Sequence, residues 1–408
     1  MPGDLPREEL ISQGRAILDW IGEYLENAAQ YPVLSQVQPG EVRASLPASP
    51  PETGESLDTI FSDFQTKIIP GITHWNSPSF FGYFATSSSV PGILAEMLVA
   101  TLDVKAMLWR TSPAATELEQ LTTDWLRQML GLGDGWFGIT TDTASISSML
   151  ALAAAREAKP ELEIRERGMA GRTDLPRLRV YSSPHAHSSV DKAALALGLG
   201  LENVVKIADD EQFRMKPDAL AEAIAADRAR GYMPLACVAT VGTTSMTSID
   251  PVPAIAEICR RENVWLHVDG AYGGTLAIVP EYRYILDGTE LADSLVVNPH
   301  KWLFTPFDCS VFFIKRPDIL KRAFSLVAEY LVTRDSDEVV NYMDYGVQLG
   351  RRFRALKLWM IIRAFGTSGL ADRLRAHCEL AKTFASWVES ASDWELMAPV
   401  PFSLVCFR

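Results

Sequence analysis

The sequence lacks paired cysteines, a membrane-length apolar run and an excess of positive charge. Its five cysteines are scattered over 408 residues without paired spacing, which favours reduced cytosolic thiols over a disulfide framework or a zinc site. No apolar stretch approaches the roughly 18 residues that a membrane span needs. The net charge of −13, from 51 acidic and 38 basic residues, argues against nucleic acid or an anionic membrane as a partner. Because Met1–Glu9 is polar and acidic, we expect no signal peptide and a cytoplasmic protein.

The chain is long enough for two or three subdomains. Residues 10–30 have helical spacing, and the prolines from Pro32 to Pro51 predict an extended connector. Such an arm needs a surface to lie on, and a second subunit would provide one.

From about residue 137 onward, apolar strand-like runs alternate with helical patterns. The runs are Arg179–Tyr181, Asn203–Ile207, Leu235–Val241, Val264–Val268 and Ser294–Val297. Helical patterns between them include Pro217–Arg230 and Pro253–Arg261. This alternation predicts an α/β fold with a central, mostly parallel sheet and flanking helices. Ligands of such sheets collect at the carboxyl ends of the strands.

Two of these strand ends carry a lysine and an aspartate. Lys301 stands in Asn298–Trp302, directly after an apolar run and between an imidazole and an indole. A strand-end lysine is ordinarily solvated, but a desolvated amine has a lowered pKa and can attack a carbonyl, so Lys301 is a candidate Schiff-base residue. Asp269 ends another apolar run. A lysine for the imine and an aspartate for the pyridinium nitrogen form the pair that pyridoxal phosphate (PLP) requires.

Thr141–Ser145 precedes the helix-like run Ile146–Glu157. Small hydroxyl residues at a helix start serve as an ordinary N-cap or bind a phosphate, and the PLP lysine favours the phosphate. His185 and His187 have a spacing that could bind metal, but no third histidine of matching spacing is evident. We therefore expect no metal site, and we expect His187 to stack on a pyridine ring.

Aromatic residues gather in Thr73–Phe84, interleaved with glycine, serine and proline. Core packing is the ordinary interpretation of an aromatic cluster. The interleaved small residues instead favour a loop that lines a pocket.

Six segments, in one order along the chain, resemble the aromatic-L-amino-acid decarboxylase family, which are group II PLP-dependent decarboxylases. They are Pro70–Trp75, Ser112–Glu119, Ala186–Val190, His267–Tyr272, Asn298–Trp302 and Leu349–Arg354. The resemblance implies the PLP-dependent transferase fold of the aspartate-aminotransferase type, as an intertwined homodimer with active sites at the subunit interface. We expect an N-terminal helical arm at the dimer interface over 1–89, a large PLP-binding α/β domain over 90–364, and an incomplete C-terminal small domain over 365–408.

The resemblance also implies the roles of the site residues. Lys301 would carry PLP, Asp269 would pair with its ring nitrogen, and His187 would stack on the ring. Tyr330 would reach the neighbouring subunit's site from a mobile loop and protonate the substrate carbon after CO₂ leaves. The other cofactor-binding residues would be Thr143, Ala144, Ser145, Thr244, Ala271, Asn298 and His300.

The substrate pocket is expected to hold a flat ring, with Met107 and Lys105 arriving from the partner subunit. The pocket residues would be Trp75, Tyr83, Phe84, Thr86, Lys105, Met107 and Gly350. In plant relatives a glycine at the position of Gly350 accompanies indolic substrates and a serine accompanies phenolic ones, and a glycine wall leaves room for an indole. Lys105 stands where animal members have an apolar or aromatic residue, and it would favour a ring hydroxyl or an acidic side chain.

We therefore predict an L-aromatic amino acid decarboxylase that slightly prefers tryptophan and 5-hydroxytryptophan over phenylalanine, tyrosine and DOPA. Aldehyde synthesis is one alternative, although its members typically replace the loop tyrosine or the stacking histidine, and this chain keeps Tyr330 and His187. Decarboxylation of an acidic amino acid is a second alternative. A catalytically silent PLP-binding fragment is a third, because the sequence from Phe402 to Arg408 is expected to end inside a strand.

Overall fold

The computed structural model describes residues 4–84, 88–326 and 339–408, and it divides into two compact units. Unit 1 is Met1–Ser87 and unit 2 is Ser88–Arg408. The α-helices of unit 1 are α1 (Arg7–Asn27), α2 (Glu41–Ala44) and α3 (Leu57–Asp63). Helix α1 confirms the helical spacing of residues 10–30, and Glu8 and Glu9 in its first turn complement the positive end of the helix dipole. The proline-rich stretch is irregular apart from the single turn of α2, as predicted.

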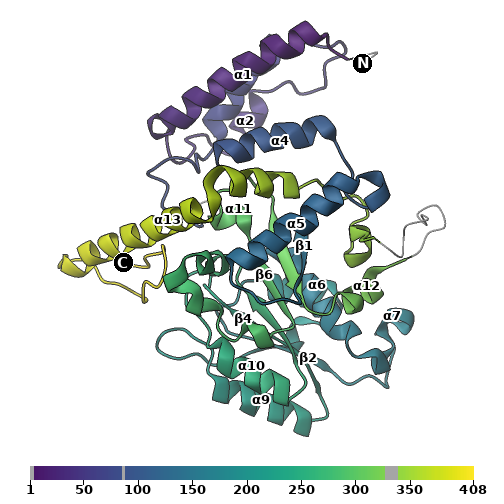
Figure 1. The fold of residues 1–408 in the computed structure, drawn as a ribbon. Coiled ribbons are helices and arrows are strands. Elements are labelled where there is room, and N and C mark those ends of the chain that lie inside the picture. Colours follow the sequence, from purple (N-terminus) through teal and green to yellow (C-terminus); the bar gives the residue numbers. More distant parts are fainter. Residues whose placement is uncertain (1–3, 85–87, 327–338) are drawn as a thin grey trace. The chain divides into compact units, whose positions relative to one another are not determined.

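Unit 2 contains the sheet and the remaining α-helices (Figure 1). The strands are β1 (Phe137–Thr141), β2 (Leu178–Ser182), β3 (Val204–Lys206), β4 (Met233–Thr240), β5 (Trp265–Asp269), β6 (Ser294–Val297) and β7 (Ser310–Ile314). The helices are α4 (Val90–Leu102), α5 (Pro113–Met129), α6 (Ala144–Glu157), α7 (Ile164–Arg167), α8 (Ser189–Ala196), α9 (Pro217–Ala229), α10 (Val252–Arg261), α11 (Pro299–Trp302), α12 (Pro317–Phe324) and α13 (Ala355–Ser390).

The seven strands form one sheet in the order β1-β7-β6-β5-β4-β2-β3. Within the described residues, only β7 is antiparallel to its neighbours β1 and β6 in this sheet, and the other paired strands are parallel. The carboxyl ends of β1, β2, β4, β5 and β6 therefore meet at the same edge of the sheet as the amino end of β7. This arrangement confirms the predicted α/β fold with a mostly parallel sheet.

Helices flank the sheet on both sides (Figure 1). Residues of α6, α8 and α12 pack with strand residues in one large core cluster. Helix α6 is rich in alanine, which lets it lie close against the sheet, and Ala151 and Ala154 are fully buried there. Most strand residues are buried, so the strands appear as continuous apolar runs in the sequence rather than as alternating patterns.

Helix α13 is interrupted at Gly366, whose φ of 65° and ψ of 168° are not helical. A positive φ is readily adopted by glycine, so this residue allows two helical segments to join at a kink. The strand expected over Phe402–Arg408 forms only at its end, where Leu396 and Phe407 make an antiparallel bridge. Backbone hydrogen bonds from Met397 to Cys406 and between Glu395 and Arg408 flank this bridge, and the residues before Cys406 are irregular. Within residues 4–84, 88–326 and 339–408, no helix combines the length and apolarity of a membrane span.

Candidate active site

Lys301 lies in α11, the single helical turn that follows β6. Its backbone N–H donates to the carbonyl of Asn298 at 2.9 Å. Burial lowers the pKa of the Lys301 amine, and the negative charge of Asp269 partly opposes this shift. A lower pKa increases the fraction of unprotonated amine, which is the nucleophilic form. The environment of Lys301 therefore suits formation of a Schiff base.

Asp269 is the last residue of β5, and only 4% of its surface is exposed. Its Oδ1 accepts a hydrogen bond from the backbone N–H of Ala271 at 3.0 Å. The carbonyl of Ala271 in turn accepts from the backbone N–H of Asn298 at 3.1 Å. These bonds connect the segment after β5 with the one that leads to Lys301. A buried carboxylate at this point suits a protonated ring nitrogen.

His187 follows β2 at the same edge of the sheet. Its Nδ1 accepts the backbone N–H of Ser189 at 3.1 Å, so the proton of the neutral ring stands on Nε2. Desolvation lowers the pKa of His187, the positive charges of Lys301 and Lys192 lower it further, and Asp269 raises it. His187 thus lies within electrostatic reach of both Lys301 and Asp269, and its ring is neutral at pH 7.

The start of α6 adds backbone donors to this group. Thr143 is its N-cap residue and its side chain makes no capping hydrogen bond. Ala144 packs with Ala271 and Val296, so the helix start lies beside the ends of β5 and β6. Free N–H groups and the positive end of the helix dipole at this point suit a phosphate. Ser145, in the first turn, is exposed to solvent.

Three other predicted cofactor residues lie at this edge. Thr244 is exposed in the loop that follows β4, and the backbone N–H of Val241 in that loop donates to the carbonyl of Asp269 at 2.8 Å. Asn298 is buried, and its Oδ1 has no hydrogen-bond partner within the described part of the chain. His300 is buried next to Lys301. Because a buried amide oxygen normally has a partner, the orphaned atom of Asn298 fits a site built for a polar ligand.

The structure brings together three of the predicted substrate residues within unit 2. The backbone N–H of Ala106, which lies between Lys105 and Met107, donates to the carbonyl of Arg351 at 2.8 Å. Arg351 directly follows Gly350, so the two segments adjoin. The Lys105 ammonium donates to the carboxylate and the carbonyl of Asp103. A Cβ at Gly350 would stand in open space.

The aromatic members of the predicted pocket lie in unit 1. The ring of Trp75 stacks on that of Phe80 at 4.7 Å and on that of Tyr83 at 5.5 Å. Trp75 is 39% exposed and Tyr83 is 85% exposed, so these rings are not core residues. Phe84 is half-buried. Thr86 and Tyr330 lie outside the described residues.

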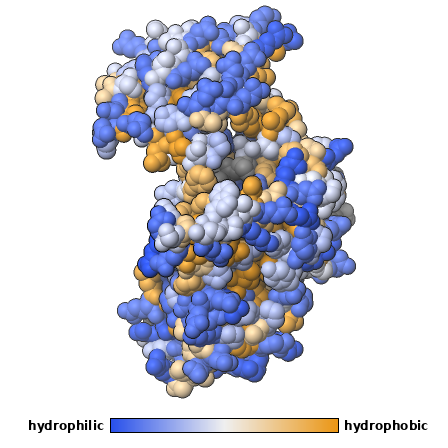
Figure 2. Space-filling view, turned by 90° about the vertical axis from the view of Figure 1, so that its left-hand side faces the viewer, coloured by the Kyte–Doolittle hydropathy of each residue, from blue (hydrophilic) through white to orange (hydrophobic). Residues whose placement is uncertain are grey.

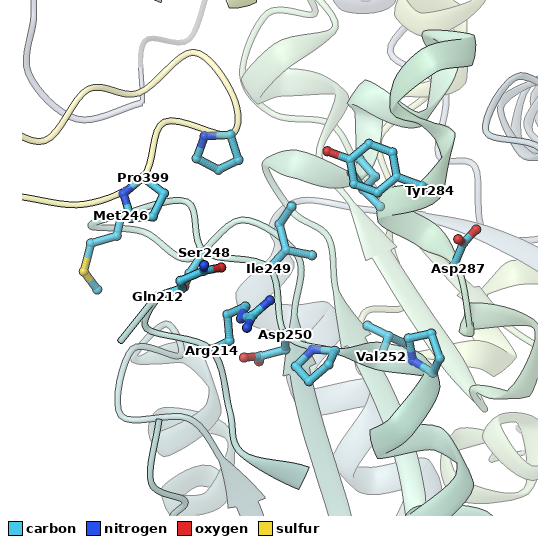
Figure 3. Close-up of a pocket in the computed structure, with 14 residues that line it drawn as sticks. Gln212, Arg214, Met246, Ser248, Ile249, Asp250, Val252, Tyr284, Asp287 and Pro399 are labelled. Atoms are coloured by element: carbon cyan, nitrogen blue, oxygen red, sulfur yellow. The ribbon is translucent and has the colours of Figure 1, made fainter. Parts of the chain in front are cut away.

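A pocket of about 310 Å³ lies next to the loop between β4 and α10 (Figure 3). Its walls come from four segments of unit 2, represented by Arg214, Ile249, Tyr284 and Pro399. None of the residues predicted from the sequence lines this pocket. The candidate active site is therefore the cluster at the strand ends around Lys301.

Sequence reasoning missed the partners that fix the predicted residues in place. The backbone N–H of Cys309 donates to His300 Nδ1 at 3.0 Å. The ring of Trp302 stacks on Tyr272 with centroids 4.7 Å apart, and its Nε1 donates to His377 Nδ1 at 3.0 Å. The motif His267–Tyr272 contains Tyr272, but nothing in the sequence identified Trp302, 30 residues later, as its stacking partner.

The fold and the strand-end cluster define a PLP-dependent enzyme of the aspartate-aminotransferase fold type. Residues 39–408 match the model of the pyridoxal-dependent decarboxylase conserved domain, and the chain belongs to this family. It is thus a PLP-dependent amino acid decarboxylase, a carboxy-lyase.

Several plant proteins are similar to the chain along almost its whole length. Tryptophan decarboxylase 2 of Oryza sativa subsp. japonica is 41% identical in an alignment of 411 positions that covers 98% of this chain and 81% of the relative. Phenylacetaldehyde synthase of Arabidopsis thaliana is also 41% identical, over 98% of this chain and 82% of its own. Tyrosine decarboxylase 4 of Petroselinum crispum is 42% identical over 99% of this chain and 79% of its own.

The fold is also that of a solved relative. The crystal structure of Oryza sativa TDC with PLP and tryptamine matches with a TM-score of 0.95 and 36% sequence identity. The match covers 99% of this chain and 84% of that one.

Proposed function

We propose that the protein decarboxylates an L-aromatic amino acid to the arylalkylamine and CO₂. The observation that carries this proposal is the meeting of a desolvated lysine, a buried aspartate and a neutral histidine at one sheet edge, in Lys301, Asp269 and His187. Relatives named tryptophan decarboxylase and tyrosine decarboxylase support an aromatic substrate.

When bound, PLP supplies an electron sink that stabilises the carbanion left by departing CO₂. In our proposal the side-chain amine of Lys301 would hold PLP through a covalent link. Asp269 would pair with the ring nitrogen of PLP, and His187 would stack on its ring. Tyr330 donates the proton that replaces the carboxylate. The N–H groups at the start of α6 would hold the phosphate, with Thr143, Ala144, Ser145, Thr244 and His300 around it.

For the substrate, we propose tryptophan and 5-hydroxytryptophan slightly ahead of phenylalanine, tyrosine and DOPA. The open space at Gly350 supports a larger ring, and the pairing of Lys105 with Asp103 leaves less reason to expect an acidic substrate. An equimolar competition assay, read by the mass of the amines, tests the order. Gly350→Ser should lower the share of tryptamine relative to tyramine. An order led by tyramine and unchanged by this substitution would show that Gly350 does not set the specificity.

Aldehyde synthesis is a second candidate, because phenylacetaldehyde synthases are as similar to the chain as the decarboxylases are. Retention of Tyr330 and His187 favours the amine. Hydrogen peroxide and ammonia as main products of the wild-type protein would reverse this ranking. An acidic substrate or a silent PLP-binding fragment would appear in the same assays, as turnover of glutamate or aspartate or as bound PLP without turnover.

We further propose a cytoplasmic homodimer with both active sites at the subunit interface. Exposed apolar side chains along α4 support an interface there. The cytosol is supported by the free state of all five cysteines. The three-domain division at residues 89 and 364 also stays a prediction.

Replacement of Lys301 tests the proposed chemistry directly. Lys301→Ala should abolish both turnover and the visible absorption of lysine-bound PLP, because it removes the amine that we propose for the link. Lys206→Ala, at a part-exposed lysine of β3, is the matched control and should retain both. Normal turnover by Lys301→Ala without the visible band would refute the assignment.

A further inference from the structure

The segment Phe304–Cys309 connects α11 to β7 and is held by two buried cations from the start of α13. Lys357 Nζ donates to the carbonyl oxygens of Pro306 at 3.1 Å and Asp308 at 2.7 Å. Arg354 Nε and Nη2 donate to the two carboxylate oxygens of Asp308 at 2.9 and 3.3 Å. The Lys357 side chain is 0% exposed and that of Arg354 is 7% exposed. Both cations are thus buried, while the Asp308 carboxylate is 22% exposed.

Helix α4 completes the enclosure of this segment. Glu96 forms ion pairs with Lys357 and with the more exposed Arg352. One turn earlier, a Cβ at Gly92 would stand 2.4 Å from Cδ of Pro306, so the helix backbone lies directly against the segment. Buried ion pairs pay a desolvation penalty and are weak evidence for stability. Another role, the precise placement of the 304–309 segment, accounts for the buried ion pairs of Lys357 and Arg354.

The segment ends at Cys309, which pairs reciprocally with His300. The backbone N–H of His300 donates to the carbonyl of Cys309 at 3.0 Å, and the backbone N–H of Cys309 donates to His300 Nδ1 at 3.0 Å. A ring nitrogen that accepts an N–H cannot carry a proton, so the proton of His300 stands on Nε2. Burial lowers the pKa of His300 to about 3, with further lowering by Lys301, Lys357 and Arg354 against a raising effect of Asp308. The ring is therefore neutral at pH 7 and has one donor, Nε2–H.

We propose that Arg354 and Lys357 are positioning residues that, through the 304–309 segment, fix His300 as a neutral Nε2–H donor to the phosphate of PLP. This inference rests on the place of His300 beside the phosphate in the proposed function. Neither cation reaches the phosphate itself in this scheme. The two cations position the backbone of the 304–309 segment, and the N–H of Cys309 in that segment selects the tautomer of His300. Loss of either cation therefore weakens the hydrogen bond from His300 to the phosphate, while Lys301 is unaffected.

The tautomer is measured by NMR of the holoenzyme labelled with ¹⁵N-histidine, and His300→Gln identifies the signals of His300. The expected spectrum has a proton on Nε2 and none on Nδ1 in the wild type. Lys357→Gln should give a mixture of tautomers. A proton on Nδ1 in the wild type, or an unchanged tautomer in Lys357→Gln, would overturn the inference.

Release of PLP from the holoenzyme gives a second readout, followed by loss of the visible absorption in excess of a PLP acceptor. Lys357→Gln and Arg354→Gln should accelerate release about tenfold, as expected for loss of one charge-assisted hydrogen bond. Arg352→Gln is the matched control, because Arg352 shares the partner Glu96 but makes no hydrogen bond to the 304–309 segment. It should leave the rate unchanged.

A double-mutant comparison separates positioning from general loosening. In the His300→Gln background, Lys357→Gln should add less than about twofold to the release rate, because its effect passes through His300. Equal acceleration with and without His300 would show a merely structural role. If Lys357→Gln fails to fold, Arg354→Lys is the alternative variant, because it retains the positive charge and loses the two hydrogen bonds to the Asp308 carboxylate. Arg354→Lys should accelerate the release of PLP and leave the melting temperature (Tm) unchanged. A wild-type protein that never shows the visible band of lysine-bound PLP would refute the proposed function. If the band is present and the Lys357 and Arg354 variants release PLP at the wild-type rate, only the present inference is refuted.

Discussion

His267 is fully buried in β5, two residues before Asp269 and on the same face of the strand. Its Nδ1 lies 2.9 Å from Ser294 Oγ, while its Nε2 has no hydrogen-bond partner within the described part of the chain. Desolvation lowers its pKa to about 4, against a raising effect of Asp269. A neutral imidazole at this depth places no positive charge in competition for the Asp269 carboxylate.

This lowered pKa predicts a loss of stability in acid. The folded state keeps His267 neutral down to about pH 4, whereas the unfolded chain takes up the proton near pH 6.5. The free energy of unfolding should therefore fall as the pH drops from 6.5 towards 4, by about 3 kcal/mol from this residue. Urea unfolding at pH 7.5 and 4.5 measures the difference.

His267→Asn is the variant for this test, because its amide can still bond Ser294 but does not titrate. Between pH 7.5 and pH 4.5 the free energy of unfolding of this variant should fall by about 2 to 3 kcal/mol less than that of the wild type, whatever its value at pH 7.5. An equal loss in both proteins would contradict a lowered pKa at His267.

At the scale of elements, the five strand-like runs identified in the sequence are β2 to β6, and their boundaries agree within two residues. Strands β1 and β7 were not among these runs. Strand β7 was missed although Ser310–Ile314 is a buried apolar run, because it lies beyond the last alternation of strand and helix and pairs antiparallel. The residues at the strand ends could be identified because the carboxyl ends of parallel strands meet at one edge of the sheet. The partners Cys309, Arg354 and Lys357 could not, because a backbone N–H leaves no trace in the sequence and the cations lie about 50 residues away.

A buried ion pair joins α5, β1 and the segment before α13. Arg351 donates to both oxygens of Glu119 at 2.5 and 3.1 Å and to the carbonyl of Thr140 at 2.7 Å, and the two side chains are 5% and 1% exposed. Glu119→Gln should lower the free energy of unfolding by about 3 to 5 kcal/mol, because it leaves a buried guanidinium without its counter-charge. Urea unfolding measures the change.

The control is Glu257→Gln, which breaks an exposed pair with Arg260 and should change stability by less than about 1 kcal/mol. The double variant Glu119→Leu with Arg351→Met should lose less than Glu119→Gln alone, since no unpaired charge remains. A double variant less stable than the single one would show that the pair itself, rather than the lone charge, sets the energy.

At the scale of the whole molecule, the chain divides after Ser87, and the aromatic residues predicted for the substrate pocket lie in unit 1 while the lysine lies in unit 2. The sequence identified both groups through separate motifs, but motif order alone contains no information on which copy of the chain completes which pocket. Orange, hydrophobic side chains reach the surface among polar ones in Figure 2.

The exposed face of α4 tests the proposed dimer. Five apolar residues at helical spacing are 42% to 58% exposed, namely Val90, Leu94, Met97, Leu98 and Leu102. Sedimentation equilibrium should give twice the chain mass of 45.1 kDa for the wild type.

Leu94→Glu with Leu98→Glu should shift the protein to monomer, since two carboxylates would be desolvated in the interface. Leu195→Glu, at a 54% exposed leucine of α8, should leave the dimer intact. The monomeric variant should keep its helical circular dichroism and lose turnover, because in the proposed dimer each active site is built from both copies. A wild-type monomer, or an active monomeric variant, would contradict active sites built at a subunit interface.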